Sequence, residues 1–178
     1  MACTLTTGRK EPCKDAVGGL TKVYFGDFDI FDIDDVTYES DSDAIASIAS
    51  TGTLFQYDLK GTSSFEQTIT SSRENGTTFY DQTLTLQFKK LDKATHDEIA
   101  LLATSRPKVF VEDNNGNIFV GGLEYGMDCN GGTVVTGAAM GDLSGYTLTL
   151  QGIEKKPANF YEGTLGDDFT VSTTQIDA

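Results

Sequence analysis

The residues that could carry out chemistry are few in this sequence. His96 is the single histidine, and it stands beside Asp97 and Glu98 in a segment typical of the first turns of a helix. A catalytic triad needs a nucleophile close to such a base, and neither a nucleophile elbow nor a cysteine-protease motif surrounds Cys129. No phosphate-binding glycine loop lies between a strand and a helix. The sequence therefore predicts no catalytic residues, no enzyme activity and no cofactor.

The cysteines are sparse and odd in number. Cys3, Cys13 and Cys129 form no CxxC pair, and both disulfide frameworks and structural zinc sites need paired spacings. We expect reduced, partly buried thiols.

Carboxylates are the most abundant chemical groups, and they are densest between residues 27 and 43. Clustered carboxylates can bind Ca²⁺, which takes about six to eight oxygen ligands. No ligand spacing is recognisable there, so a solvated acidic surface is the favoured interpretation and calcium binding remains the alternative. Residues 113–117 resemble the start of a calcium loop, and Glu124 falls in register at its end. However, Ile118 occupies the position that requires glycine, so no metal site is predicted.

The overall charge excludes a further class of function. The formal net charge of the 178 residues is −14, with a pI near 4.2. Nucleic-acid affinity comes mainly from Lys and Arg, so this chain is not expected to bind DNA. No apolar run approaches the roughly 20 residues that span a bilayer. The N-terminus lacks a secretory pattern, which predicts synthesis in a bacterial-type cytoplasm.

Alternation with a period of two dominates the sequence and predicts strands with one buried face. It is clearest in residues 53–60, 79–89 and 145–152, where apolar residues alternate with Thr and Gln. Asn-Gly steps favour tight hairpins because they accept positive φ. Asn115-Gly116 should join strands at 108–113 and 117–121. Asn75-Gly76 should likewise join strands at 63–71 and 77–90.

One helix is expected, over residues 93–104. Asp92 or Thr95 can cap it, Thr95 with Glu98 matches a capping box, and Pro107 prevents its continuation. Its apolar side chains should pack on the sheet: Ile99, Leu102 and Ala103.

We interpret residues 1–178 as a single, mainly β domain: an antiparallel β-sandwich or half-barrel with one flanking helix. Three stretches look irregular: an N-terminal arm at 1–20, a glycine-rich loop at 121–145 and a C-terminal extension at 154–178. Long loops inside compact domains are usually functional. We expect these stretches to make contacts between subunits.

Two segments resemble structural proteins of tailed bacteriophages, and the second resembles the tail tube (major tail) protein family in particular. The first runs from Cys3-Thr4-Leu5-Thr6-Thr7-Gly8-Arg9 through Glu11-Pro12-Cys13-Lys14-Asp15-Ala16-Val17-Gly18-Gly19 to Val23-Tyr24-Phe25. The second runs from Gly137-Ala138-Ala139-Met140-Gly141-Asp142-Leu143-Ser144-Gly145 through Tyr146-Thr147-Leu148-Thr149-Leu150 to Gly152-Ile153-Glu154. Together they cover about a quarter of the chain.

The resemblance implies a virion protein that is made in the host bacterium and forms hexameric rings. The rings would stack into a hollow tail tube, contact other tail proteins and let DNA pass through without binding it. Acidic residues expected to face the lumen are Asp29, Asp32, Asp34, Glu66 and Asp81. The alternatives are another small phage protein, for head decoration or tail completion, or a β module that binds calcium or a glycan.

Overall fold

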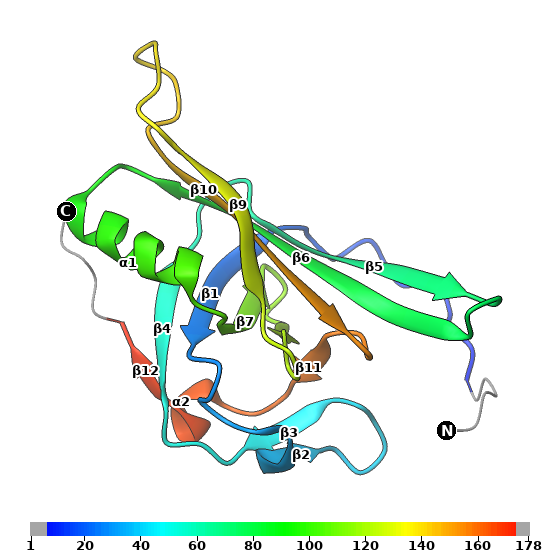
Figure 1. Cartoon of the computed structure of the whole chain (residues 1–178). Helices are drawn as coiled ribbons and strands as arrows, with labels where there is room; N and C mark the ends of the chain where they lie inside the picture. Colours follow the sequence, from blue (N-terminus) through cyan, green and yellow to red (C-terminus); the bar gives the residue numbers. More distant parts are fainter. Residues whose placement is uncertain (1–6, 174–178) are drawn as a thin grey trace.

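The computed structural model describes residues 7–173, which form two open β-sheets with one helix of three turns, α1 (Lys93–Thr104). The large sheet has eight strands, in the order β12-β4-β1-β7-β8-β11-β3-β2, and the small sheet has four, in the order β5-β6-β10-β9 (Figure 1). The strands of the large sheet are β1 (Leu20–Gly26), β2 (Val36–Tyr38), β3 (Ile45–Ile48), β4 (Thr53–Asp58), β7 (Lys108–Asp113), β8 (Ile118–Gly121), β11 (Asn159–Tyr161) and β12 (Thr170–Ser172). The small sheet consists of β5 (Ser64–Ser72), β6 (Thr77–Lys89), β9 (Asp128–Val135) and β10 (Gly145–Glu154). A 3-10 turn, η1 (Ile33–Asp35), and a four-residue helix, α2 (Leu165–Asp168), complete the fold.

The large sheet is apolar on both faces, so the molecule has two hydrophobic cores. Val23 and Val111 point toward the small sheet and pack with Leu84 of β6 and Leu150 of β10. Tyr24 and Phe110, their chain neighbours, point to the opposite face and pack with residues of β3, β11 and α2. Strands that are buried on both faces read as continuous apolar runs and not as alternating ones. The mainly β expectation is confirmed, and neither sheet closes into a barrel. The expected antiparallel pairing is wrong for two strand pairs of the large sheet, because β3 with β11 and β4 with β12 are parallel.

Both hairpins predicted from Asn-Gly steps are present. β5 and β6 pair up to Ser72 and Thr77, and Gly76 has a φ of +63°. β7 and β8 are joined by a turn in which the Gly116 amide donates to the Asp113 carbonyl at 3.2 Å, and Gly116 has a φ of +84°. Among the described residues Asn75 and Asn115 do not share the positive φ. Glycine alone therefore provides the left-handed conformation that each turn needs.

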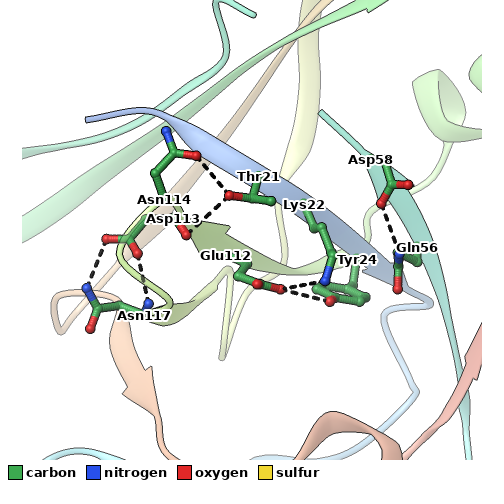
Figure 2. Close-up of polar contacts among 9 residues, drawn as sticks. All are labelled: Thr21, Lys22, Tyr24, Gln56, Asp58, Glu112, Asp113, Asn114 and Asn117. Carbon is green, nitrogen blue, oxygen red and sulfur yellow. Dashed lines mark hydrogen bonds and ion pairs between the residues drawn. The ribbon is translucent and has the colours of Figure 1, made fainter. Parts of the chain in front are cut away.

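The Asp113 carboxylate organises the β7–β8 turn from inside. Its Oδ1 accepts the backbone amides of Asn115 and Asn117, each at 2.8 Å. Its Oδ2 accepts their side-chain amides at 3.1 and 2.9 Å. Figure 2 shows the Asn117 contacts, with Thr21 bonded to Asn114 beside them. These hydrogen bonds hold the pKa of Asp113 below its usual range although burial opposes them. Residues 113–117 thus form the hairpin that the sequence favoured over a calcium loop.

Helix α1 has the predicted bounds, and its cap is Asp92, whose Oδ1 accepts the Thr95 amide at 2.8 Å. Thr95 is therefore the third helical residue, and its predicted capping box with Glu98 is wrong. Ile99 is buried and Leu102 is half-buried against the core between the sheets, as expected. Ala103 is exposed, which contradicts the prediction, because only a narrow stripe of this helix touches the sheets.

Two stretches predicted to be irregular contain regular structure. The glycine-rich stretch 121–145 includes β9, and 154–178 includes β11, α2 and β12. Glycine weakens local strand preference, and β11 and β12 have only three residues each. Their partners are distant in sequence: β11 pairs with β8 and β3, and β12 pairs with β4. The N-terminal arm is irregular as expected over its described part: residues 7–19 contain no helix or strand and are exposed.

Candidate assembly surface

The outer face of the small sheet, which points away from the large sheet, is polar in its centre, and its apolar residues stand toward the strand ends: Phe79, Val135 and Ile153. Alternation turns the Leu residues of β6 and β10 into the core and the residues between them outward. The register places the outward residues in rows across the two central strands: Thr83, Thr85 and Gln87 on β6 with Thr147, Thr149 and Gln151 on β10. This half of the sequence pattern is confirmed. These central rows need no apolar cover and can border water.

Hydrogen bonds connect the strands across this outer face. Gln151 Nε2 of β10 donates to both carboxylate oxygens of Asp81 on β6, each at 2.8 Å. Asn130 of β9 donates to Gln151 Oε1 at 2.7 Å. Glu66 on β5 stands opposite Thr83, and Thr68 stands opposite Asp81. Two of the five acidic lumen candidates, Glu66 and Asp81, therefore share one face of the small sheet.

Asp29, Asp32 and Asp34 lie elsewhere, in the segment between β1 and β2 on the large sheet. Asp32 and Asp29 stand near Lys108, a buried lysine at the start of β7 that is only 3% exposed. The Lys108 ammonium donates to the Phe31 carbonyl and lies 4.0 Å from the centroid of the Phe31 ring. Burial lowers the pKa of Lys108, while these carboxylates oppose the shift. The structure does not bring these three aspartates together with Glu66 and Asp81.

The small sheet ends in two unpaired edges, β5 and β9. Among residues 7–173 no strand pairs with the outer side of either one. Their lengths are similar, nine and eight residues. Because all neighbours in this sheet are antiparallel, β5 and β9 run in opposite directions. Ile69 of β5 and Val134 of β9 leave 65% and 54% of their surface exposed. Both point to the inner face of the sheet, at its two edges.

The loop between β9 and β10 extends away from both sheets (Figure 1). Met140 at its end is fully exposed. The Asp142 carboxylate accepts the amides of Ala138 and Ala139 at 3.0 and 2.7 Å, which lowers the pKa of Asp142. The loop therefore has a defined turn at its tip and presents a large apolar side chain to solvent.

A contact that sequence reasoning missed fastens the N-terminal arm. Asn115 Nδ2 donates to the Val17 carbonyl at 2.8 Å, and Asn115 Oδ1 accepts the Val17 amide at 2.9 Å. Asn114 Nδ2 donates to the Gly18 carbonyl at 2.6 Å. The Asn115-Gly116 turn thus both reverses the chain and fixes the start of the arm. The sequence contained a hint of this contact, because the turn has more asparagines than a connection between two strands requires.

The residues considered for catalysis are dispersed. His96 is exposed, with its ring 6.1 Å from that of Tyr146. Cys13 is exposed and not partly buried as expected, Cys129 is half-buried on β9, and Cys3 lies outside the described residues. The described part of the chain contains no group of three or more His, Cys, Asp or Glu side chains that could hold a metal ion. None of its helices is long and apolar enough to cross a membrane.

The surface with the strongest structural case is therefore the outer face of the small sheet together with its two edges. No protein-family model matches the chain, and comparisons with curated proteins and with solved structures likewise found no match.

Proposed function

We propose that this protein is a structural virion protein that assembles into six-membered rings, which stack to form the tube of a bacteriophage tail. The proposal combines the sequence resemblance with one structural observation. The small sheet has two free edges of similar length and opposite direction. When β9 of one copy lies beside β5 of the next, the antiparallel order continues from copy to copy. Repeating this head-to-tail contact gives a closed ring when the rotation between copies adds up to a full turn.

Edge pairing also relieves two liabilities of the isolated chain. Unpaired strand edges are sites of uncontrolled association, and natural proteins cover or close them. Ile69 and Val134 are exposed at opposite edges on the same face of the sheet. Joining β5 to β9 places both apolar side chains at the seam between copies. Their burial would favour association by roughly 25 cal/mol per Å² of apolar surface removed from water.

In such a ring the polar outer face of the small sheet lines the channel. Its Thr and Gln rows can face water, and Glu66 and Asp81 add negative charge. DNA carries negative phosphates, so an acidic lining repels it weakly and leaves it free to move. The conduit therefore passes DNA without binding it.

The edge contact can be trapped with a disulfide because β9 carries a native thiol, Cys129. Cys129 points to the inner face of the sheet, as does Ser71 of β5. If the start of β9 in one copy is aligned with the end of β5 in the next, these two residues lie near each other. In a chain with Cys3 and Cys13 changed to serine, Ser71→Cys should give an oxidised ladder of covalent oligomers that ends at six copies. Negative-stain images should show rings or tubes.

Thr78→Cys is the matched control, because Thr78 pairs with Ser71 from the next strand inward. It should give no ladder. A chain that stays monomeric in sedimentation across a wide concentration range, without cross-links from Ser71→Cys, would overturn the ring proposal. Rings that form without this cross-link would show that another surface closes them.

A further inference from the structure

A buried carboxylate at the end of β10 has one oxygen without a partner. Glu154 is 5% exposed, and its Oε1 accepts the amides of Glu124 and Tyr125 at 3.1 and 2.9 Å. No donor among the described residues reaches Oε2. Among residues 7–173, every side-chain nitrogen or oxygen that is shielded from solvent has a hydrogen-bond partner. Because Oε2 has none, it must be in contact with solvent. A buried carboxylate is costly unless it is paired.

Glu154 lines a pocket of about 230 Å³ between the two sheets. Its walls are mainly apolar and come from β8, from the turn that follows it and from the segment before β11: Val120, Leu123, Pro157 and Ala158. The other lining residues include two lysines: Ile33, Tyr38, Gln82, Glu124, Lys155, Lys156 and Asn159. An apolar shaft with a carboxylate along it suits a long side chain that ends in a cation. The volume admits one such side chain and excludes a folded segment.

The two lysines that line the pocket form ion pairs with other carboxylates. Lys155 Nζ pairs with Glu124 at 2.7 Å, and Lys156 Nζ pairs with Asp43 at 3.8 Å. Lys108 attracts Glu154, but its ammonium donates to the Phe31 carbonyl and forms no ion pair with Glu154. Burial raises the pKa of Glu154, and Glu124 adds to this shift, while the two backbone amides and Lys108 oppose it. Glu154 therefore forms no ion pair with any residue between 7 and 173 of its own chain.

The exposed N-terminal arm carries three cations without ion pairs. Arg9, Lys10 and Lys14 are exposed, and none of them has an ion pair within the described residues. The arm is fastened at Val17 by Asn115, so its free part begins just before that residue. An extended chain advances roughly 3.3 Å per residue, which gives Lys10 a reach of about 23 Å from Val17.

We infer that the Glu154 pocket binds a basic side chain from the arm of a second copy of this chain. The inference rests on the self-association proposed above. Within one chain none of the arm residues 7–16 lines the pocket. Two chains with a net charge of −14 repel each other, so a contact between copies needs matched opposite charges at defined points. The arm carries such cations and the pocket carries the unpaired carboxylate.

A two-component disulfide test decides whether the arm reaches this pocket between copies. One chain carries Pro157→Cys, at the exposed rim of the pocket, and Cys13→Ser. The other keeps the native Cys13, which lies between Lys10 and Lys14, and has Pro157 unchanged. In both, Cys3 and Cys129 are serine. Oxidation of the mixture should give a covalent dimer that neither chain forms alone.

Charge variants show whether Glu154 holds the arm. Glu154→Gln keeps the size and the acceptor at Oε1 but removes the charge, so the yield of mixed dimer should fall at least fivefold. Changing Arg9, Lys10 and Lys14 together to glutamine should lower it equally. These arm side chains are exposed, so this variant remains decisive even where Glu154→Gln impairs folding. Glu162→Gln, an exposed carboxylate outside the pocket lining, should leave the yield unchanged.

Two results would overturn the inference. The first is a mixed dimer whose yield is insensitive to the arm charges. The second is a cross-link that forms only within one chain, when Pro157→Cys and the native Cys13 are on the same molecule. The Ser71→Cys ladder through Cys129 is read in parallel. If the Ser71→Cys ladder forms but the mixed dimer does not, the proposed role of the Glu154 pocket is rejected and the ring proposal is retained. If neither product forms, the ring proposal is rejected as well.

Discussion

At the scale of single residues, Gly116 shows how one backbone conformation supports two structural roles. It adopts a φ of +84° at the β7–β8 turn, where the amides of Asn115 and Asn117 converge on Asp113. The same turn holds the N-terminal arm through Asn114 and Asn115. A change in the turn should therefore affect stability and arm position together.

Gly116→Val should lower the free energy of unfolding by about 1–3 kcal/mol, because a β-branched residue at positive φ is strained. A Cβ at Gly116 would meet no atom within 4 Å, so steric crowding contributes nothing. Gly141→Val is the matched control, since that site also has open space but no positive φ. The measurement is chemical denaturation of both variants. Equal stabilities would show that backbone strain at Gly116 is absent.

At the scale of elements, α1 is held by its N-cap and by a small apolar contact with the core. Only Ile99 is buried along its 12 residues, so few contacts hold the helix in place. Asp92 makes two hydrogen bonds at the start of the helix. Its side chain accepts the Thr95 amide, and its backbone carbonyl accepts the Tyr146 hydroxyl at 3.1 Å. These hydrogen bonds to the side chain lower the pKa of Asp92 in the folded state.

Asp92→Ala should reduce stability by about 1 kcal/mol at neutral pH, the usual cost of losing an N-cap, and Asp92→Asn should cost much less. The folded-state pKa of Asp92 is lowered, so the carboxylate stabilises the fold above its ordinary pKa. That contribution disappears as pH falls through the lowered value. The stability gap between the native chain and Asp92→Ala should therefore narrow in acid, as measured by thermal unfolding from pH 7 to pH 2. A gap that is constant over this range would contradict the assignment.

At the scale of the whole molecule, charge must be reconciled with assembly. Six copies at −14 each carry about −84, a repulsion that weakens ring closure unless salt screens it. Arm cations placed at Glu154 would offset part of this repulsion locally. The small sheet contributes Glu66 and Asp81 to the face proposed to line the channel, whereas Asp29 and Asp34 are exposed on the large sheet.

Glu66→Lys with Asp81→Lys should slow genome ejection, because each new cation in the channel can pair with a DNA phosphate. The delay should be largest at low salt. Ejection is timed from virions with correctly assembled tails at low and high salt. The control is Asp29→Lys with Asp34→Lys, which makes the same charge change outside the outer face and should leave ejection unaltered. Equal kinetics for both pairs at both salt concentrations would remove the electrostatic role of this face and leave the structural role standing.

The sequence by itself determined the features that depend on neighbours in the chain. A period-two pattern requires one buried face, so the long strands β6 and β10 could be predicted from it. Glycine after asparagine marks positive φ, which located both hairpins. An aspartate before an amphipathic run marked the start of α1. In each case the deciding interaction spans only a few residues.

Tertiary structure alone decided which distant segments meet. β11 and β12 are too short to be stable locally and exist through pairing with β8, β3 and β4. The grouping of Glu66 with Asp81, apart from Asp29, Asp32 and Asp34, follows from strand register. The unpaired oxygen of Glu154 follows from how β10 packs beneath the turn at Glu124 and Tyr125. A one-dimensional pattern carries no register between strands far apart in sequence, because hydrophobic burial is non-directional and only the assembled sheets select the partners.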